Sequence, residues 1–336
     1  MVSLQDVQTS NAAIASRLPP GLVGVFVGAT QGIGCMTMKA LARYTVRPRI
    51  YFVGRTREAG DAVLAELKAL NPDGVYTFIA ADVSRICTVD EICFDIQRHE
   101  TAVNLLFLTT GTPRAYVTTA EDLHLPAALV HYCRARFIVN LLPQLRKATD
   151  LRRVVSVFAG GKEGPVTIDD IQGWKVPLLA SRGHLSSVLT VSYESIAEQA
   201  PDVSFIHNFP GAVKTDFLRE ATGLLFTFFK AVFWLLAPFI CISSEECGER
   251  HLFLATSARY PAKQDGQGNS GVPLPEGLTV ASGTDRVPGS GVYSLRSDGE
   301  SSGLAVEELL AKFREDGVTE KVWEDVEREF KRITRD

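Results

Sequence analysis

Residues 22–34, Leu-Val-Gly-Val-Phe-Val-Gly-Ala-Thr-Gln-Gly-Ile-Gly, decide the fold of this chain. The continuous apolar run 22–27 has the length of a strand and is typical of a strand buried on both faces of a parallel sheet. Three glycines follow it, and Cys35–Tyr44 then has the apolar spacing of a helix. A strand, a glycine-rich turn and a helix in this order predict a turn that binds phosphate groups at the N-terminus of the helix.

Each glycine of the turn has a separate role in the spacing Gly-x-x-x-Gly-x-Gly. Gly28 permits the tight turn, Gly32 lets the backbone approach a pyrophosphate, and Gly34 allows the helix to pack closely on the strand. The intervening side chains are expected beside the same phosphates. The predicted phosphate-binding residues are Gly28, Thr30, Gln31, Gly32, Ile33 and Gly34.

Short β-rich runs alternate with helical stretches along the next 170 or so residues. The expected strands after the first are Ile50–Val53, Val75–Ala80, Val103–Leu108, Val154–Phe158 and Val203–His207, with a helix at Glu58–Leu70 between the first two. This alternation predicts an α/β fold with a doubly wound, Rossmann-type parallel sheet and right-handed crossovers.

Composition excludes several functional classes. Hydrophobic residues make up 46% of the 336 residues, charged residues make up 22%, and the net charge is −4, so no basic field favours nucleic acid. The six cysteines form no Cys-x-x-Cys pair, which argues against a metal site and against a disulfide framework. Residues 1–16 lack the basic start and apolar core of a signal peptide, so a cytoplasmic protein is expected.

Three motifs resemble those of the short-chain dehydrogenase/reductase family: the glycine turn at 28–34, Ala81-Asp82-Val83, and Pro210-Gly-Ala-Val-Lys-Thr215. The resemblance covers residues 20–260, and the run 209–257 is similar to retinol-dehydrogenase-like members that act on lipophilic substrates. It implies that the chain binds a nicotinamide dinucleotide. The further cofactor-binding residues that it implies are Asp82 and Val83 at the adenine, Thr109 and Gly111 after the fourth strand, and Pro210, Gly211, Val213 and Thr215 at the nicotinamide amide.

Arg55 follows the second strand, where an acidic residue would accept the ribose 2′-hydroxyl of NAD. A guanidinium at this position pairs with the 2′-phosphate of NADP instead, so NADP is the expected cofactor. The alternative is a solvated surface arginine.

The resemblance fails where the family carries its chemistry. The family uses a tyrosine as general acid/base, a lysine four residues later, and a serine after the fifth strand. Alignment with the family places Leu179, Gly183 and Ala159 at these positions, and no Tyr-x-x-x-Lys occurs in the chain. The Asn-Asn-Ala-Gly motif is replaced by Leu-Thr-Thr-Gly at 108–111, and the family's proton-relay asparagine is missing from 131–136.

Substitute catalytic groups are sought in the same region, although each has an ordinary structural explanation. Ser156 suits a strand, Lys175 suits a solvated loop, and Trp174 suits either a substrate cleft or a core. The catalytic candidates are Ser156, Ser181 and Lys175, with Lys162, Arg182, His184 and Tyr193 as the other side chains considered.

The strongly apolar segment Leu224–Ile242 contains Lys230 and Pro238, which argue against a membrane span. Three alternatives stay open: a lid over a lipophilic substrate, peripheral docking on an internal membrane, or a buried helix or homodimer contact. The expected organisation is a lead-in at 1–20, a dinucleotide-binding domain at 21–260, a Gly/Ser/Pro-rich surface loop at 261–303, and a C-terminal helix at 304–336.

Two functions from different classes follow. The first is an NADP-dependent oxidoreductase that acts on a small lipophilic carbonyl or alcohol, similar to proteins of fungal secondary-metabolite pathways. The second is a non-redox protein on the same fold, which binds a nucleotide and a lipophilic ligand for isomerisation, cyclisation or binding alone. The intact glycine turn favours the first, and the missing tyrosine and lysine favour the second.

Overall fold

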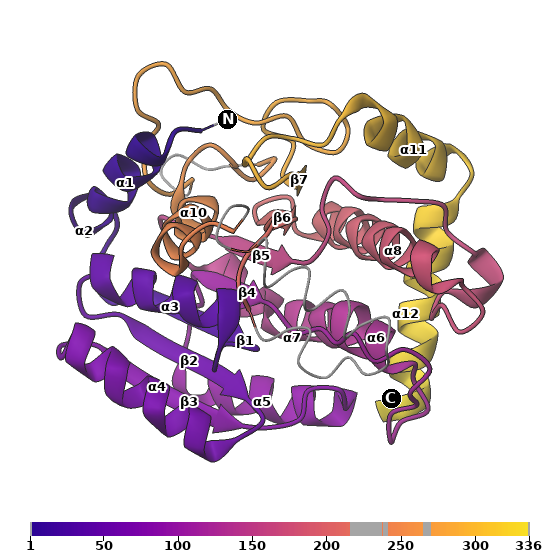
Figure 1. The fold of residues 1–336 in the computed structure, drawn as a ribbon, viewed down its shortest axis with the longest axis horizontal. Helices are drawn as coiled ribbons and strands as arrows, with labels where there is room; N and C mark the ends of the chain where they lie inside the picture. Colours follow the sequence, from indigo (N-terminus) through magenta and orange to yellow (C-terminus); the bar gives the residue numbers. More distant parts are fainter. Residues whose placement is uncertain (1, 216–236, 238–240, 265–269, 335–336) are drawn as a thin grey trace.

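A parallel sheet forms the centre of the molecule (Figure 1), and the computed structural model describes residues 2–215, 237, 241–264 and 270–334. The strand order is β3-β2-β1-β4-β5-β6-β7, and every neighbouring pair is parallel. The strands are β1 (Val23–Val27), β2 (Arg49–Gly54), β3 (Val75–Ala80), β4 (Leu105–Leu108), β5 (Arg153–Val157), β6 (Ser204–Asn208) and β7 (Val292–Leu295). The chain winds outward from β1 to one edge and from β4 to the other, which confirms the predicted doubly wound fold.

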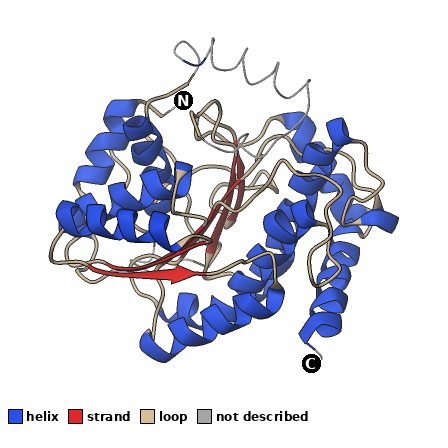
Figure 2. Cartoon of the chain, turned by 60° about the horizontal axis from the view of Figure 1, so that its bottom comes forward, coloured by secondary structure: helices blue, strands red, loops and turns tan. Residues whose placement is uncertain are grey.

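Helices cover both faces of the sheet, as Figure 2 shows. The helices are α1 (Leu4–Ala12), α2 (Ile14–Arg17), α3 (Gly32–Tyr44), α4 (Arg57–Leu70), α5 (Ile86–His99), α6 (Leu125–Ala127), α7 (Cys133–Lys147), α8 (Leu178–Gln199), α10 (Ser244–Thr256), α11 (Leu304–Glu315) and α12 (Val318–Thr334). A π-helical turn, Ala128–Tyr132, joins α6 to α7, and a 3₁₀ turn lies at Ile168–Asp170.

The strands alternate their side chains between two apolar clusters. Val25 and Val27 of β1 pack with α5, α7, α8 and α12, whereas Phe26 packs with α3, α4 and α10 on the opposite face. All five residues of β1 are buried, because helices cover both faces. This double burial explains why β1 appears in the sequence as a continuous apolar run.

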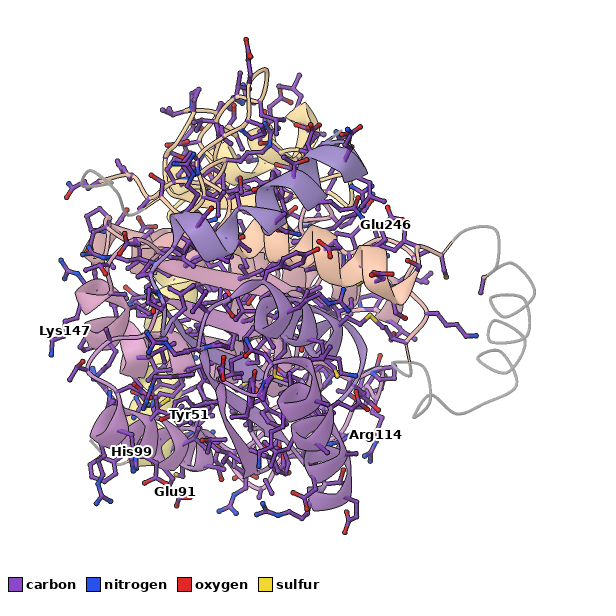
Figure 3. All side chains as sticks on the ribbon, turned by 90° about the vertical axis from the view of Figure 1, so that its left-hand side faces the viewer. Tyr51, Glu91, His99, Arg114, Lys147 and Glu246 are labelled. Atoms are coloured by element: carbon purple, nitrogen blue, oxygen red, sulfur yellow. The ribbon has the colours of Figure 1, made fainter. Side chains whose placement is uncertain are left out.

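The N-terminal residues, expected only as a polar lead-in, form helices that dock on α10. The Asn11 side-chain amide donates hydrogen bonds to the backbone carbonyl of Glu249 (2.9 Å) and to its carboxylate (2.6 Å). Tyr44 of α3 donates to the same carboxylate at 2.8 Å. Figure 3 shows α1 beside α10, the helix on which Glu246 is labelled.

The expectation of a surface loop throughout 261–303 is wrong for Val292–Leu295, which forms the edge strand β7 with all four residues buried. The run has only four residues and Gly291 precedes it, so the surrounding Gly, Ser and Pro obscured it. Its pairing partner β6 is about 90 residues distant along the chain, at Phe205–Asn208. A strand this short is stabilised by that non-local pairing rather than by its own sequence.

The single C-terminal helix expected at 304–336 is two helices, α11 and α12. They separate at Gly317, whose φ of +68° lies in the left-handed region that ends helices. Val326 and Phe330 of α12 enter the main core, and the Arg136 guanidinium lies 5.0 Å from the Phe330 ring centroid. The C-terminal segment is therefore integral to the domain.

The apolar segment 224–242 lies outside the described residues except for Ala237, Cys241 and Ile242. A parallel bridge joins Val213 to Ile242, so the described residues on the two sides of this segment lie next to each other. Among the helices that the structure describes, none combines the length and apolar character needed to cross a membrane.

Candidate functional site

The glycine turn after β1 has the geometry that the sequence predicts. Gly28 and Gly32 have φ values of +82° and +60°, a region that L-residues other than glycine rarely adopt. Gly34 has ordinary helical geometry, but a Cβ there would lie 2.7 Å from Thr109 Oγ1 and 3.1 Å from Ala29 Cα. The first two glycines are therefore required by backbone conformation and the third by close packing.

The N-terminus of α3 faces this turn. Gln31 precedes the helix in an extended conformation, and its side chain makes no capping hydrogen bond. The first backbone N–H groups of a helix carry partial positive charge and have no partner within the helix. This arrangement suits a phosphate group.

The ends of β2 and β3 flank the turn on one side. A Cβ at Gly54 would lie 2.3 Å from Thr30 Cγ2, so the turn packs directly on the end of β2. Arg55, the next residue, is exposed. Asp82 follows β3, where its Oδ1 accepts the N–H of Ser84 at 3.0 Å, and Val83 is buried. The residues predicted at the adenosine half of the cofactor thus lie at the same edge of the sheet as the glycine turn; they are Arg55, Asp82 and Val83.

The ends of β4 and β6 flank the turn on the other side. Thr109 Oγ1 lies 3.0 Å from the carbonyl oxygens of both Val27 and Gly28, which ties the end of β4 to the turn. The segment 210–215 after β6 folds back to the turn, because a Cβ at Gly32 would lie 3.5 Å from Thr215 Cγ2. Gly211 has a φ of +74°, and a Cβ there would lie 2.9 Å from Ser297 Cβ. The structure therefore brings the predicted residues of the 109–111 and 210–215 segments to the glycine turn.

At the two positions of α8 where the family carries its tyrosine and lysine, this chain has residues without an acidic or basic side chain. Leu179 is 99% exposed in the first turn of α8. Gly183 is packed against Gly164, with a Cβ at Gly183 falling 3.2 Å from Gly164 Cα. Any side chain at 183 would have to displace the loop that follows β5.

The three catalytic candidates are scattered rather than gathered. Ser156 is completely buried on β5, and its hydroxyl pairs with that of Tyr193, whose pKa burial raises to about 12. Ser181 is half-buried in the first turns of α8. Lys175 is exposed, and its backbone N–H donates to Asp170 Oδ2 at 2.6 Å.

Arg134 is a buried cation that sequence reasoning missed. Its Nη2 donates to the carbonyl oxygens of Thr110 and, at 3.2 Å, Val157, the points where β4 and β5 end. Its Nε and Nη1 have no hydrogen-bond partner within the described part of the chain, and burial lowers the pKa of the guanidinium. Its place three residues before Phe137 on the apolar face of α7 indicates burial, but nothing in the sequence identifies the carbonyl groups that it contacts.

A buried polar network holds the loop that follows β5. Thr190 and Ser294 donate to Glu163 Oε1 at 2.8 and 2.6 Å. The N–H of Ala159 donates to His207 Nε2 at 3.0 Å, which leaves the ring proton on Nδ1, 2.8 Å from Thr190 Oγ1. Burial lowers the pKa of His207, so the imidazole is neutral. Burial acts to raise the pKa of Glu163, but its contacts with His207 and Ser294 outweigh burial and lower it.

An aromatic stack joins the loops after β4 and β5. The His124 ring lies 4.4 Å from Trp174 and 6.3 Å from Tyr116, measured between ring centroids. His124 Nε2 accepts the Tyr116 N–H at 3.1 Å, and Nδ1 donates to the carbonyl of Gln172 at 2.7 Å. Tyr116 is 61% exposed. The stack therefore links the segment that follows β4 to the segment that follows β5.

Comparison with known proteins places this geometry in a family, although no family model matches the chain. The chain is 39% identical to oxidoreductase AN1596 of Emericella nidulans, covering 97% of both chains. It is 30% identical to short-chain dehydrogenase/reductase SAT2 of Stachybotrys chartarum, covering 96% of this chain and 95% of that one. Among solved structures, the RhlG/NADP complex of Pseudomonas aeruginosa shares the fold with a TM-score of 0.56 at 17% identity, over 79% of this chain and 98% of that one. On its sequence relatives and its fold, the chain belongs to the short-chain dehydrogenase/reductase family.

Proposed function

We propose that the protein is an NADP(H)-dependent oxidoreductase that acts on a small lipophilic carbonyl or alcohol. The observation that carries the proposal is the glycine turn, whose backbone leaves no room for a Cβ at Gly28 or Gly34 and faces an uncapped helix N-terminus. It lies beside the point where the strand order reverses, between β1 and β4, and ligands of doubly wound sheets bind at that point.

Arg55 supports NADP over NAD. The exposed guanidinium follows β2 directly, on the side of the reversal point where the adenosine half would lie. A charge-assisted contact with a 2′-phosphate is worth about 1.5–3 kcal/mol. Two solved structures that share the fold are named as NADP or NADPH complexes, the P. aeruginosa RhlG/NADP complex and the L-sorbose reductase of Gluconobacter frateurii.

The protein's own part in the reaction is binding and orientation. The turn at 28–34 and the N-terminus of α3 would hold the pyrophosphate, and the 210–215 segment would hold the nicotinamide amide beside the ends of β4 and β6. The bound cofactor supplies the hydride. The stack of Tyr116, His124 and Trp174 would form one wall of the substrate site and exclude water from one side.

For the apolar segment 224–242 we propose the lid function, with substrates of a fungal secondary-metabolite type. The described residues on either side of the segment meet in the parallel bridge between Val213 and Ile242, beside the proposed nicotinamide contacts. Phe229→Asp combined with Trp234→Asp is expected to weaken ligand binding. Liposome flotation of the unmutated protein, abolished by the double substitution while nucleotide still binds, would favour a membrane anchor instead.

A non-redox role is the second candidate, and Leu179, Gly183 and Ala159 favour it because they place no acid or base at the family's catalytic positions. One experiment separates the two candidates. Purified protein is titrated with NADPH, with fluorescence of the reduced nicotinamide as the signal, and lipophilic ketones are then added. Binding followed by loss of nicotinamide absorbance supports the oxidoreductase, whereas binding without oxidation of NADPH by any ketone supports the non-redox role.

A further inference from the structure

The loop after β5 is held by hydrogen bonds from three neighbouring elements. Both backbone polar groups of Ala159 are hydrogen-bonded, because its N–H donates to His207 Nε2 at 3.0 Å and its carbonyl accepts from Ser186 Oγ at 2.6 Å. The N–H of Gly161 donates to Ser294 Oγ at 2.7 Å. Three elements, α8, β6 and β7, therefore hold the start of this loop.

The turn at residues 159–162 is closely packed and closed by a hydrogen bond. Gly160 packs against the end of β6, so that a Cβ there would lie 2.2 Å from the His207 carbonyl oxygen. Gly161 has a φ of +72°, and the N–H of Lys162 closes the turn on the carbonyl of Ala159 at 3.0 Å. The next side chain, Glu163, is buried in the polar network. Lys162 is thus a single exposed residue between two anchored neighbours.

The ammonium group of Lys162 projects over the end of β6. Its Nζ lies 5.7 Å from the ring centroid of Phe209, the residue immediately before the Pro210-Gly211 turn. This position is on the β4–β6 side of the reversal point, opposite the side that carries Arg55 and Asp82. A dinucleotide whose pyrophosphate lies on the glycine turn would place its second half on the Lys162 side.

A carbonyl that receives a hydride develops negative charge on its oxygen, which needs a cation or an acid nearby. Ser156 and Tyr193 are both completely buried, and Leu179 carries no acid. Lys162 is an accessible acid on this edge, and the backbone of its loop packs against Gly183.

Resting on the oxidoreductase function proposed above, we propose that Lys162 is the catalytic acid of this chain and contacts the substrate oxygen. The carbonyl carbon gains a hydride from the nicotinamide, and the π electrons of the carbonyl move to its oxygen. That oxygen takes a proton from the ammonium, which becomes a neutral amine and is reprotonated by water. Alcohol oxidation follows the same steps in reverse.

Differential labelling tests the position of Lys162 without any substrate. The intact protein is acetylated with acetic anhydride, and Lys162 and Lys175 are quantified by peptide mass spectrometry. Both lysines are exposed and both lie between β5 and α8, so Lys175 is the matched control. NADPH is expected to protect Lys162 and leave Lys175 unchanged, whereas 2′,5′-ADP, which lacks the nicotinamide half, protects neither.

Chemical rescue tests the role. Lys162→Ala is expected to lower the rate of NADPH-dependent reduction of 9,10-phenanthrenequinone by about 10²–10⁴-fold, the usual contribution of a general acid. Added methylammonium should restore part of this rate, and Lys147→Ala, which changes an exposed lysine at the C-terminal end of α7, should keep the full rate. A merely structural lysine would not be rescued by a free amine.

The outcomes separate this inference from the function on which it rests. Failure of the unmutated protein to bind NADPH overturns the oxidoreductase proposal itself. NADPH binding with equal acetylation of Lys162 in its presence and absence overturns the assignment of Lys162 alone. A folded Lys162→Ala variant with full activity, or one with low activity that no amine restores, also overturns it.

Discussion

Gly34 provides the sharpest test of how the glycine turn is built. Replacing glycine by alanine inside a helix ordinarily stabilises a protein by about 1 kcal/mol, because alanine has the higher helix propensity. At Gly34 the added Cβ would lie 2.7 Å from Thr109 Oγ1 and 3.1 Å from the Gly28 carbonyl oxygen. Overpacking of this kind costs about 1–3 kcal/mol. Gly34→Ala is therefore expected to lower the free energy of unfolding despite the gain in propensity.

The assay is equilibrium unfolding in urea, with the free energy of unfolding obtained from the midpoint and slope. The double variant Gly34→Ala, Thr109→Ala is the control, because it removes the oxygen nearest to the added methyl group. Since the two sites are in contact, the double variant should lose less stability than the sum of the two single variants. The steric account is refuted if Gly34→Ala alone stabilises the protein, or if the two effects simply add.

Three further predictions concern the cofactor, the buried histidines and the missing catalytic pair. Arg55→Ala should remove most of a ten- to hundredfold preference for NADPH over NADH (about 1.5–3 kcal/mol), and equal affinities in the unmutated protein would refute the 2′-phosphate role. His131 has a pKa lowered to about 3 by complete burial, so the unfolded state binds the proton first. Stability from this group is present above about pH 6.5 and is lost as the pH falls toward 3, by about 1.4 kcal/mol per pH unit. His131→Leu should flatten that dependence in urea unfolding at stepped pH, and an unchanged slope would contradict the assignment. Leu179→Tyr with Gly183→Lys should leave turnover low, because the lysine would displace the loop at 164, and a large gain in rate would show a decayed ordinary site.

The sequence predicted the strands and the glycine turn well, because these features depend on local rules. A strand buried on both faces, such as β1, is rich in apolar residues, and positive φ values favour glycine at Gly28 and Gly32 whatever the distant surroundings. These constraints act over a few residues, so they remain visible in the residues themselves. The same reasoning located β3 at Val75–Ala80, bounds that the structure confirms.

The surroundings of Ser156 and Lys162 could not be predicted in this way, because they come from contacts between distant segments. Ser156 was a candidate by sequence position, yet the pairing of β5 with its neighbours turns it into the core against Tyr193. The sequence favours a solvated loop charge at Lys162. The structure shows that its loop is held at Ala159 by His207 and at Gly161 by Ser294.

What the sequence by itself determined is therefore the doubly wound architecture and the geometry of the glycine turn, through apolar periodicity and the conformational freedom of glycine. Only the tertiary structure decided that Val292–Leu295 is a strand, that Arg134 contacts two strand ends, and that the loop after β5 is hydrogen-bonded to β6 and β7. The physical reason is that burial and hydrogen bonding depend on which elements meet in space. A four-residue run or a single arginine carries no local signal of partners about 90 or about 20 residues away.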